Sequence, residues 1–117
     1  MSFADEMIRG LDQESAGEQL RYLYGSDEAM LKAQRERYTS LIRCHAELFG
    51  DREGVQLISA PGRTEIGGNH TDHNHGRVLA AAVNLDALCA VSPRDDLHVS
   101  FHSEGYAPIS MSRISPV

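Results

Sequence analysis

The chain of 117 residues contains no tryptophan, and aromatic residues make up only 6% of it. It has 11 lysine and arginine residues against 17 aspartate and glutamate residues, which gives a net charge of −6. A nucleic-acid surface needs basic side chains against the phosphates and aromatic rings against the bases. Because the sequence has little of either, we expect no nucleic-acid partner.

Cysteine and long apolar runs are also scarce. The two cysteines, Cys44 and Cys89, form neither a disulfide framework nor a CxxC metal motif. They fall in a helix pattern and an apolar strand pattern, so we expect both to be buried small hydrophobes. The longest uncharged apolar run, Val78 to Leu85, is too short to cross a membrane, and the first residues do not resemble a signal peptide. These features predict a cytoplasmic protein with no membrane partner.

Helical patterns fill the first part of the chain. Gly10 and Gly17 limit any helix before Leu23 to short pieces. A stronger helix is predicted from the N-cap Ser26 to the terminator Gly50. Its apolar stripe at helical spacing consists of Leu31, Tyr38, Leu41, Ile42, His45, Leu48 and Phe49. We interpret the stripe as the core face of an amphipathic helix rather than a partner-binding surface.

Strand patterns fill the second part. A short strand is predicted over Val55 to Ser59, ending at Pro61, and a longer one over Val78 to Ser92, an apolar run broken by Asn84 and Asp86. Two further runs alternate, Leu97 to His102 as a half-buried strand and Ala107 to Ile114. The order predicts an α+β fold, with N-terminal helices followed by a mostly antiparallel sheet.

This order also predicts one partial domain over 1–117, with a helical part (1–50) and a strand-rich part (51–117). The sequence stops just after a predicted strand, so nothing in it remains to cover the sheet. Exposed sheet edges are normally covered. We therefore expect either a homo-oligomer formed through this surface or a piece of a longer protein.

The stretch from Ala60 to Leu79 has the highest density of side chains that could bind a ligand or take part in catalysis. It carries Pro61, several glycines, and a cluster of His, Asp and Asn side chains. A metal site could use His70, Asp72, His73 and His75, whose ligand types suit Zn, Mn or Fe, although the spacing matches no standard zinc motif. A phosphate loop is a weaker reading, because the glycines lack the G-x-x-x-x-G-K-[ST] pattern.

Two other readings of this stretch stay open. A polyhydroxylated ligand would suit Asp72 as acceptor and the amides of Asn69 and Asn74 as donors and acceptors, while Arg63 could stabilise developing phosphoryl charge. The remaining reading is a glycine-rich turn with solvated polar residues.

The run PGRTEIGGNHTDHNHGRVL, Pro61 to Leu79, resembles the galactokinase signature of the GHMP sugar-kinase superfamily, roughly P-G-R-V-N-L-I-G-E-H-T-D-Y-N-x-G-x-V-L. The resemblance extends over residues 55–103 and points to the N-terminal segment of that family. It implies the start of the GHMP kinase N-terminal domain, which is ribosomal protein S5 domain 2-like. It also implies transfer of the γ-phosphate of ATP, with Mg, to the anomeric hydroxyl of galactose.

The resemblance further implies roles for individual residues. Arg63 would be catalytic beside the reacting hydroxyl, and Asn69, His70, Asp72 and His73 would bind the sugar. The sequence departs from the family pattern at three positions, with Glu65 for asparagine, Asn69 for an acidic residue and His73 for tyrosine.

The family's glycine- and serine-rich phosphate loop has no counterpart in these 117 residues, so we expect them to be inactive alone. The alternatives are a non-catalytic sugar-binding or sensing module and a His/Asp metal-binding protein.

Overall fold

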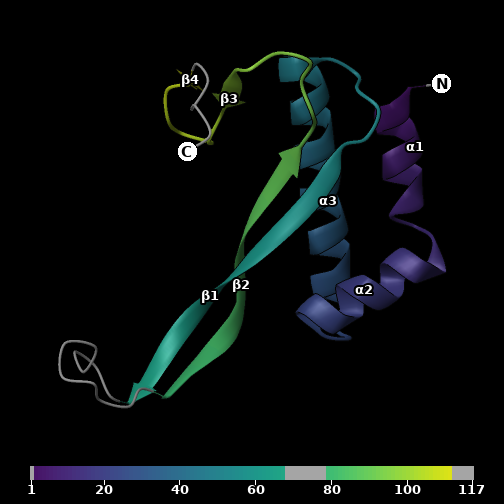
Figure 1. Cartoon of the computed structure of the whole chain (residues 1–117). Coiled ribbons are helices and arrows are strands. Elements are labelled where there is room, and N and C mark those ends of the chain that lie inside the picture. The colour runs from purple at the N-terminus through teal and green to yellow at the C-terminus, as the bar shows by residue number, and fades with distance from the viewer. Residues whose placement is uncertain (1, 68–78, 112–117) are drawn as a thin grey trace.

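The computed structural model describes residues 2–67 and 79–111, in which three helices precede four antiparallel strands. The predicted α+β order of helices followed by strands is thereby confirmed (Figure 1). The elements are α1 (Phe3–Gly10), α2 (Glu14–Tyr24), α3 (Glu28–Phe49), β1 (Gln56–Gly67), β2 (Leu79–Val91), β3 (Val99–Phe101) and β4 (Ile109–Met111). No helix in this described part is long and apolar enough to cross a membrane.

The long helix α3 follows its sequence signals closely. Its cap is Asp27 rather than the predicted Ser26, because the Asp27 carboxylate accepts a hydrogen bond from the Met30 amide at 3.2 Å. Gly50 ends the helix, as predicted, with a φ of 89° that favours glycine. The apolar stripe is buried over much of its length, but Leu48 is 47% exposed.

The hydrophobic core lies among the three helices. Its buried members are Leu11, Leu20, Tyr24, Leu31, Tyr38 and Ile42. Leu57 of β1 and Leu88 of β2 pack against this cluster and bring the strands to it. Helix α1 ends at Gly10, as predicted, but Gly17 lies buried inside α2 and does not limit that helix. Cys44 is exposed rather than buried, because it lies about 100° around the helix from buried His45.

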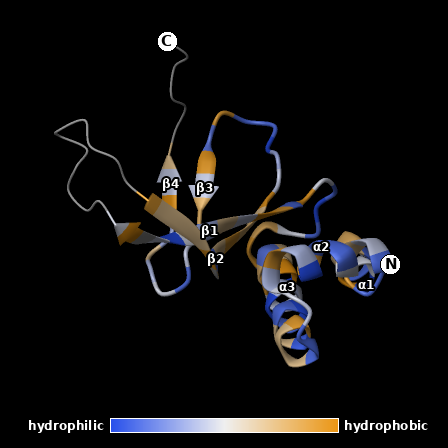
Figure 2. Ribbon diagram, turned by 90° about the horizontal axis from the view of Figure 1, so that it is seen from below, coloured by the Kyte–Doolittle hydropathy of each residue, from blue (hydrophilic) through white to orange (hydrophobic). Residues whose placement is uncertain are grey.

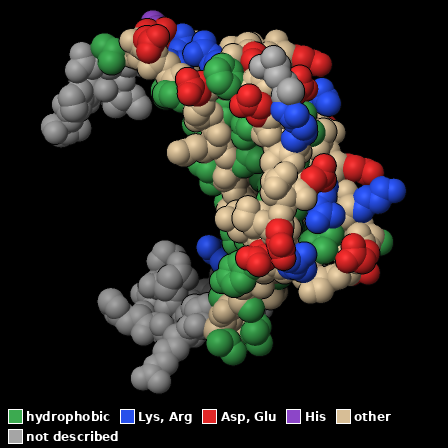
Figure 3. Space-filling view, turned by 90° about the vertical axis from the view of Figure 1, so that its right-hand side faces the viewer, with side chains coloured by type: hydrophobic (Ala, Val, Ile, Leu, Met, Phe, Trp, Pro, Cys, Tyr) green, Lys and Arg blue, Asp and Glu red, His purple; other side chains and the backbone are tan. Residues whose placement is uncertain are grey.

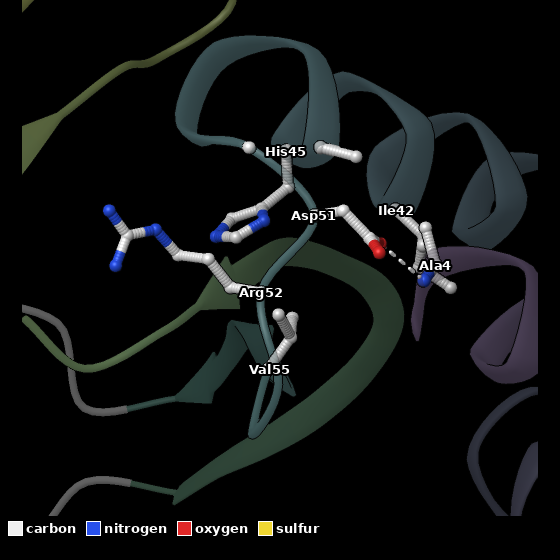
Figure 4. Close-up of a pocket in the computed structure, with 8 residues that line it drawn as sticks. Ala4, Ile42, His45, Asp51, Arg52 and Val55 are labelled. Carbon is white, nitrogen blue, oxygen red and sulfur yellow. Dashed lines mark hydrogen bonds between the residues drawn. The ribbon is translucent and has the colours of Figure 1, made fainter. Parts of the chain in front are cut away.

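Asp51, in the turn after α3, holds the beginning of α1. Its carboxylate oxygens accept hydrogen bonds from the amides of Phe3 and Ala4 at 2.9 and 2.8 Å. Figure 4 shows the bond from Ala4. Ser2 caps the same helix by accepting from the Asp5 amide at 3.0 Å. The first helix is thus tied to the beginning of the strand region.

Strands β1 and β2 form a long antiparallel hairpin, whose outer half extends away from the helices (Figure 1). Strand β1 runs through Pro61 to Gly67, so the predicted end at Pro61 is wrong. Proline is tolerated at edges and bulges, and β1 offers both, since β2 is its only partner in the described chain and the register shifts beside Pro61.

A second, separate pair of strands, β3 and β4, comes after the hairpin (Figure 2). Leu97, Val99 and Phe101 alternate as predicted, but they are 52–63% exposed, so the predicted half-buried face is wrong. Figure 3 shows acidic and basic side chains intermixed over the helical side of the molecule, with no large patch of one sign.

Candidate functional site

The signature stretch is divided between the two strands of the hairpin. Ala60 to Gly67 belong to β1, and Leu79 begins β2, so the first part of the predicted loop is strand. Arg63, the predicted catalytic residue, lies on β1 opposite Ala82 and is exposed. Residues 68–78 lie outside the described residues.

That interval contains every residue predicted to bind the sugar. Asn69, His70, Asp72 and His73 therefore stay predictions, and the same holds for the alternative metal site built on them. Within residues 2–67 and 79–111, no cluster of three or more His, Cys, Asp or Glu side chains could hold a metal ion. The structure therefore places only Arg63 of the predicted site residues.

A bulge interrupts the hairpin beside Arg63. Pro61 lies opposite Asp86 and Arg63 opposite Ala82, so the three residues from Val83 to Leu85 face the single residue Gly62. A bulge bends its strand and so changes the direction of the residues beyond it. A Cβ on Gly62 would lie 3.3 Å from both the Leu85 carbonyl oxygen and Val83 Cγ2, which explains glycine at this signature position.

Asp86 lies at the inner end of this bulge, and its side chain is only 5% exposed. Its carboxylate accepts hydrogen bonds from Tyr24 Oη at 2.5 Å, from Arg37 Nη1 at 2.6 Å and from the Ser59 hydroxyl. Arg37 Nη2 also donates to the Asp86 backbone oxygen at 2.9 Å. These four residues join α2, α3, β1 and β2 and are named here the Asp86 cluster.

Tyr38 extends the Asp86 cluster toward the core. Its hydroxyl lies 2.9 Å from that of Tyr24, and the two rings meet edge to face with centroids 6.2 Å apart. Because the Tyr24 hydroxyl proton goes to Asp86, Tyr38 is the donor of the bond between them. Burial, followed by this hydrogen bond, raises the pKa of Tyr38.

The electrostatics of the cluster favour an ionised Asp86. Burial alone would raise its pKa, but hydrogen bonds from Ser59, Tyr24 and Arg37 outweigh burial and lower it. The hydrogen bond to Asp86 raises the pKa of Arg37 in turn. The cluster is therefore a paired and hydrogen-bonded ionic contact rather than an isolated buried charge.

Sequence reasoning missed this cluster. Its partners are distant along the chain, with Tyr24 62 residues and Arg37 49 residues from Asp86. One feature of the sequence could have indicated it: Asp86 is a single carboxylate inside the apolar run of β2. A carboxylate that is buried needs hydrogen-bond or charged partners. That signal identifies Asp86 but not the partners.

A recess lies at the C-terminal end of α3 (Figure 4). It is bounded by Ala4, Ile42, His45, Asp51, Arg52 and Val55. Its volume is about 10 Å³. That is room for no more than about one water molecule, so it is not a sugar site.

Comparison with known proteins identifies the signature. Residues 43–93 match the family model described as the galactokinase galactose-binding signature. The galactokinase of Bacillus subtilis (strain 168) is 38% identical over 61 residues, which cover 52% of this chain and 16% of that protein. The Lactococcus lactis subsp. lactis (strain IL1403) galactokinase is 32% identical over 73 residues, covering 62% of this chain and 18% of that protein.

A third relative, the Streptococcus mutans serotype c galactokinase, is 36% identical over 75 residues, covering 64% of this chain and 19% of that protein. The matched segment thus spans less than a fifth of each of these relatives. No solved structure matches the chain.

The match to the family model runs from the last third of α3 through both strands of the hairpin. It therefore includes Arg63 and the paired residues Pro61 and Asp86. Residues 43–93 therefore carry the galactose-binding signature that is typical of galactokinases. The chain is a galactokinase-like segment, and the resemblance to the N-terminal segment of galactokinases is confirmed.

Proposed function

We propose that this chain contributes the galactose-binding part of a galactokinase. The observation that carries the proposal is the signature over residues 43–93, presented on a hairpin whose inner half is fixed to the helices. In the proposed reaction, the whole protein transfers the γ-phosphate of ATP, with Mg, to the anomeric hydroxyl of galactose.

The signature residues take separate roles in this proposal. Arg63 lies beside the reacting hydroxyl and offsets negative charge that develops during phosphoryl transfer. Asn69, His70, Asp72 and His73 hydrogen-bond the sugar hydroxyls, since amide, imidazole and carboxylate groups together match their donors and acceptors. The exposure of Arg63 supports its role, because an exposed guanidinium is accessible to a ligand.

Calorimetric titration with galactose, using glucose and mannose as controls, tests the sugar site. We expect galactose-selective heat that is lost in Asp72→Ala and kept in Asp12→Ala, which removes an exposed carboxylate outside the signature. Equal heats in both variants would contradict the assignment. Absence of galactose heat in the unmodified chain would mean that these residues do not bind the sugar by themselves.

Phosphoryl transfer needs a phosphate site that these residues do not contain in recognisable form. We therefore expect no ADP release when the 117-residue protein is mixed with galactose, ATP and Mg. Turnover above a no-protein control would contradict this part of the proposal. Binding without turnover is also what a sugar-sensing module would show, so restoring turnover with added galactokinase sequence would distinguish the two functions.

We further propose that the fold is the start of a GHMP kinase N-terminal domain and that the protein acts in the cytoplasm. The long helix leading into a hairpin that bears the signature supports the fold. The free thiols of Cys44 and Cys89 are compatible with a reducing compartment. An experimental structure with galactose would test the fold, and cell fractionation would test the compartment.

Self-association through the hairpin is a further part of the proposal. In the described chain, β1 and β2 pair only with each other, so each leaves an edge without a strand partner. The face turned away from the helices carries Ile58 and Val91, which are 49% and 44% exposed. Open edges beside apolar side chains favour pairing with a second copy. The molar mass from light scattering tests this proposal.

A further inference from the structure

The hairpin that bears the signature has two halves with different surroundings. In the inner half, Leu57 and Leu88 pack against the helical core. In the outer half, Ile66 and Leu79 are 64% and 61% exposed, and this half projects beyond the helices (Figure 1). The direction of the outer half is therefore set where it leaves the core.

Asp86 lies where the outer half of the hairpin leaves the helical core. It lies opposite Pro61, directly before the bulge, and it is bound to both adjacent helices through Tyr24 and Arg37. The hydroxyl of Ser59 on the neighbouring strand reaches the same carboxylate. One side chain thus connects α2, α3 and β1 at the base of the projecting half.

Arg37 fixes Asp86 in a way that a single ion pair would not. One guanidinium nitrogen contacts the carboxylate at 2.6 Å, and the other contacts the backbone oxygen of the same residue at 2.9 Å. This fork holds the β2 backbone against α3 as well as the side chain. The two contacts from Arg37 therefore fix the position along α3 at which β2 passes. They also fix the residue at which the bulge begins.

Arg63 lies two residues beyond Pro61 on β1, just past the bulge. The register of β1 and β2 shifts between Pro61 and Arg63, so the position of Arg63 depends on how the bulge is held. Any rotation of the hairpin about the Asp86 cluster would displace Arg63 and the rest of β1 to Gly67. A displacement of about 1 Å is enough to impair a binding or catalytic constellation.

We propose that Asp86 is a positioning residue, which through Arg37, Tyr24 and Ser59 sets the direction in which the hairpin presents the sugar-binding signature. This inference rests on the proposed galactose site for its effect on binding. Its effect on the hairpin is independent of any sugar. Of the cluster residues only Tyr24 belongs to the buried helical core, so we expect loss of the carboxylate charge to change the hairpin more than the helices.

The test compares Asp86→Asn with Asp96→Asn. Asp96 forms an exposed ion pair with Arg94 at 2.7 Å, away from the hairpin junction, so it is a matched control. We expect Asp86→Asn to weaken galactose binding about tenfold, as for loss of a charge-assisted contact, with the helical circular dichroism retained. The control is expected to bind as the unmodified chain does.

Amide hydrogen exchange in the sugar-free protein gives a second readout. In Asp86→Asn, hydrogen-bonded amides of the outer half, from Arg63 to Gly67 and from Leu79 to Ala82, are expected to exchange about tenfold faster. Amides of the inner half, from Gln56 to Ala60, are expected to stay within about twofold. A uniform increase across the protein, or no change in the outer half, would overturn the positioning role.

The two readouts separate the possible failures. If the unmodified chain binds no galactose, the proposed function of the isolated chain fails, and the exchange pattern still decides the role of Asp86. If Asp86→Asn does not fold, Ser59→Ala is the milder variant, because it removes one of the three side-chain donors and leaves Arg37 paired. Unchanged exchange in the outer half of folded Ser59→Ala would then overturn the proposal.

Discussion

His45 is a single residue that makes stability depend on pH. It is 6% exposed on α3, its Nε2 lies 3.0 Å from the Ser92 hydroxyl, and burial, followed by the nearby charge of Arg52, lowers its pKa. Between this lowered value and the ordinary value of about 6.5, the unfolded chain binds the proton more readily. The free energy of unfolding is therefore expected to fall as pH drops from about 7 through this window.

Urea unfolding at a series of pH values checks this expectation. His45→Gln should flatten the pH dependence between about pH 7 and 5, because its amide does not titrate there. His98→Gln, which changes an exposed histidine, should keep the slope of the unmodified chain. Parallel slopes for the unmodified chain and His45→Gln would show that His45 is not the group responsible.

Asp51 is the second residue whose contribution can be isolated. Replacing it by alanine leaves the Phe3 and Ala4 amides without their carboxylate acceptor. Loss of such a cap is expected to lower the free energy of unfolding by about 1 kcal/mol. Denaturant unfolding of Asp51→Ala and of the exposed control Asp95→Ala measures the difference. Equal midpoints for the two variants would contradict the capping role.

At the scale of elements, the hairpin depends on the absence of a side chain at Gly62. In Gly62→Ala, the new methyl group meets the Leu85 carbonyl and Val83 at 3.3 Å. We expect a loss of about 1–3 kcal/mol from overpacking, concentrated at the bulge. Gly10→Ala has no atom within 4 Å of its new methyl and lies in α1, so it is expected to be neutral or stabilising. Thermal unfolding of both proteins checks the contrast.

The same elements show what sequence reasoning can reach. Helix α3 and strand β2 were both predicted to within about two residues of their ends. Their extents follow from the spacing of apolar residues and from local turn residues, such as the terminator Gly50. The continuation of β1 through Pro61 was missed because it depends on pairing with β2, a strand that comes later in the sequence. Asp86 was visible as an interruption of an apolar run, but its contacts with Tyr24 and Arg37 depend on how helices and hairpin pack.

The site divides in a similar way. The signature motif located Arg63 and residues 55–93 of the segment that the family model matches, since these depend on order along the chain. Bending of the hairpin at Gly62 could not be predicted, because a bulge arises from the register of two strands rather than from either alone. The roles of Asn69, His70, Asp72 and His73 remain predictions that sugar titration will test.

At the scale of the molecule, the chain is more extended than its length requires. Its radius of gyration is 17.9 Å, against about 13 Å for a compact domain of this size. The outer half of the hairpin projects beyond the helices (Figure 1). Apolar surface presented in this way is available for contact with a further copy or further sequence.

The proposed self-association leads to a measurable change in mass. Light scattering of the unmodified chain is expected to give about twice its 12.9 kDa at high concentration. Ile58→Lys combined with Val91→Lys places charge on the face of the hairpin that is turned away from the helices. This double variant should return the mass to that of one chain. Ala33→Lys combined with Ser40→Lys adds the same charge at two exposed positions of α3 and serves as control. A monomeric unmodified chain would contradict the proposal.

The cap that Asp51 provides also bears on the order of folding. An isolated helix of eight residues is too short to persist in water, and the acceptor for its first amides lies 47 and 48 residues further along. During synthesis, α1 therefore leaves the ribosome well before its cap. We expect it to dock only after α3 and the turn beyond it have formed, so that Asp51→Ala accelerates unfolding while leaving the refolding rate nearly unchanged.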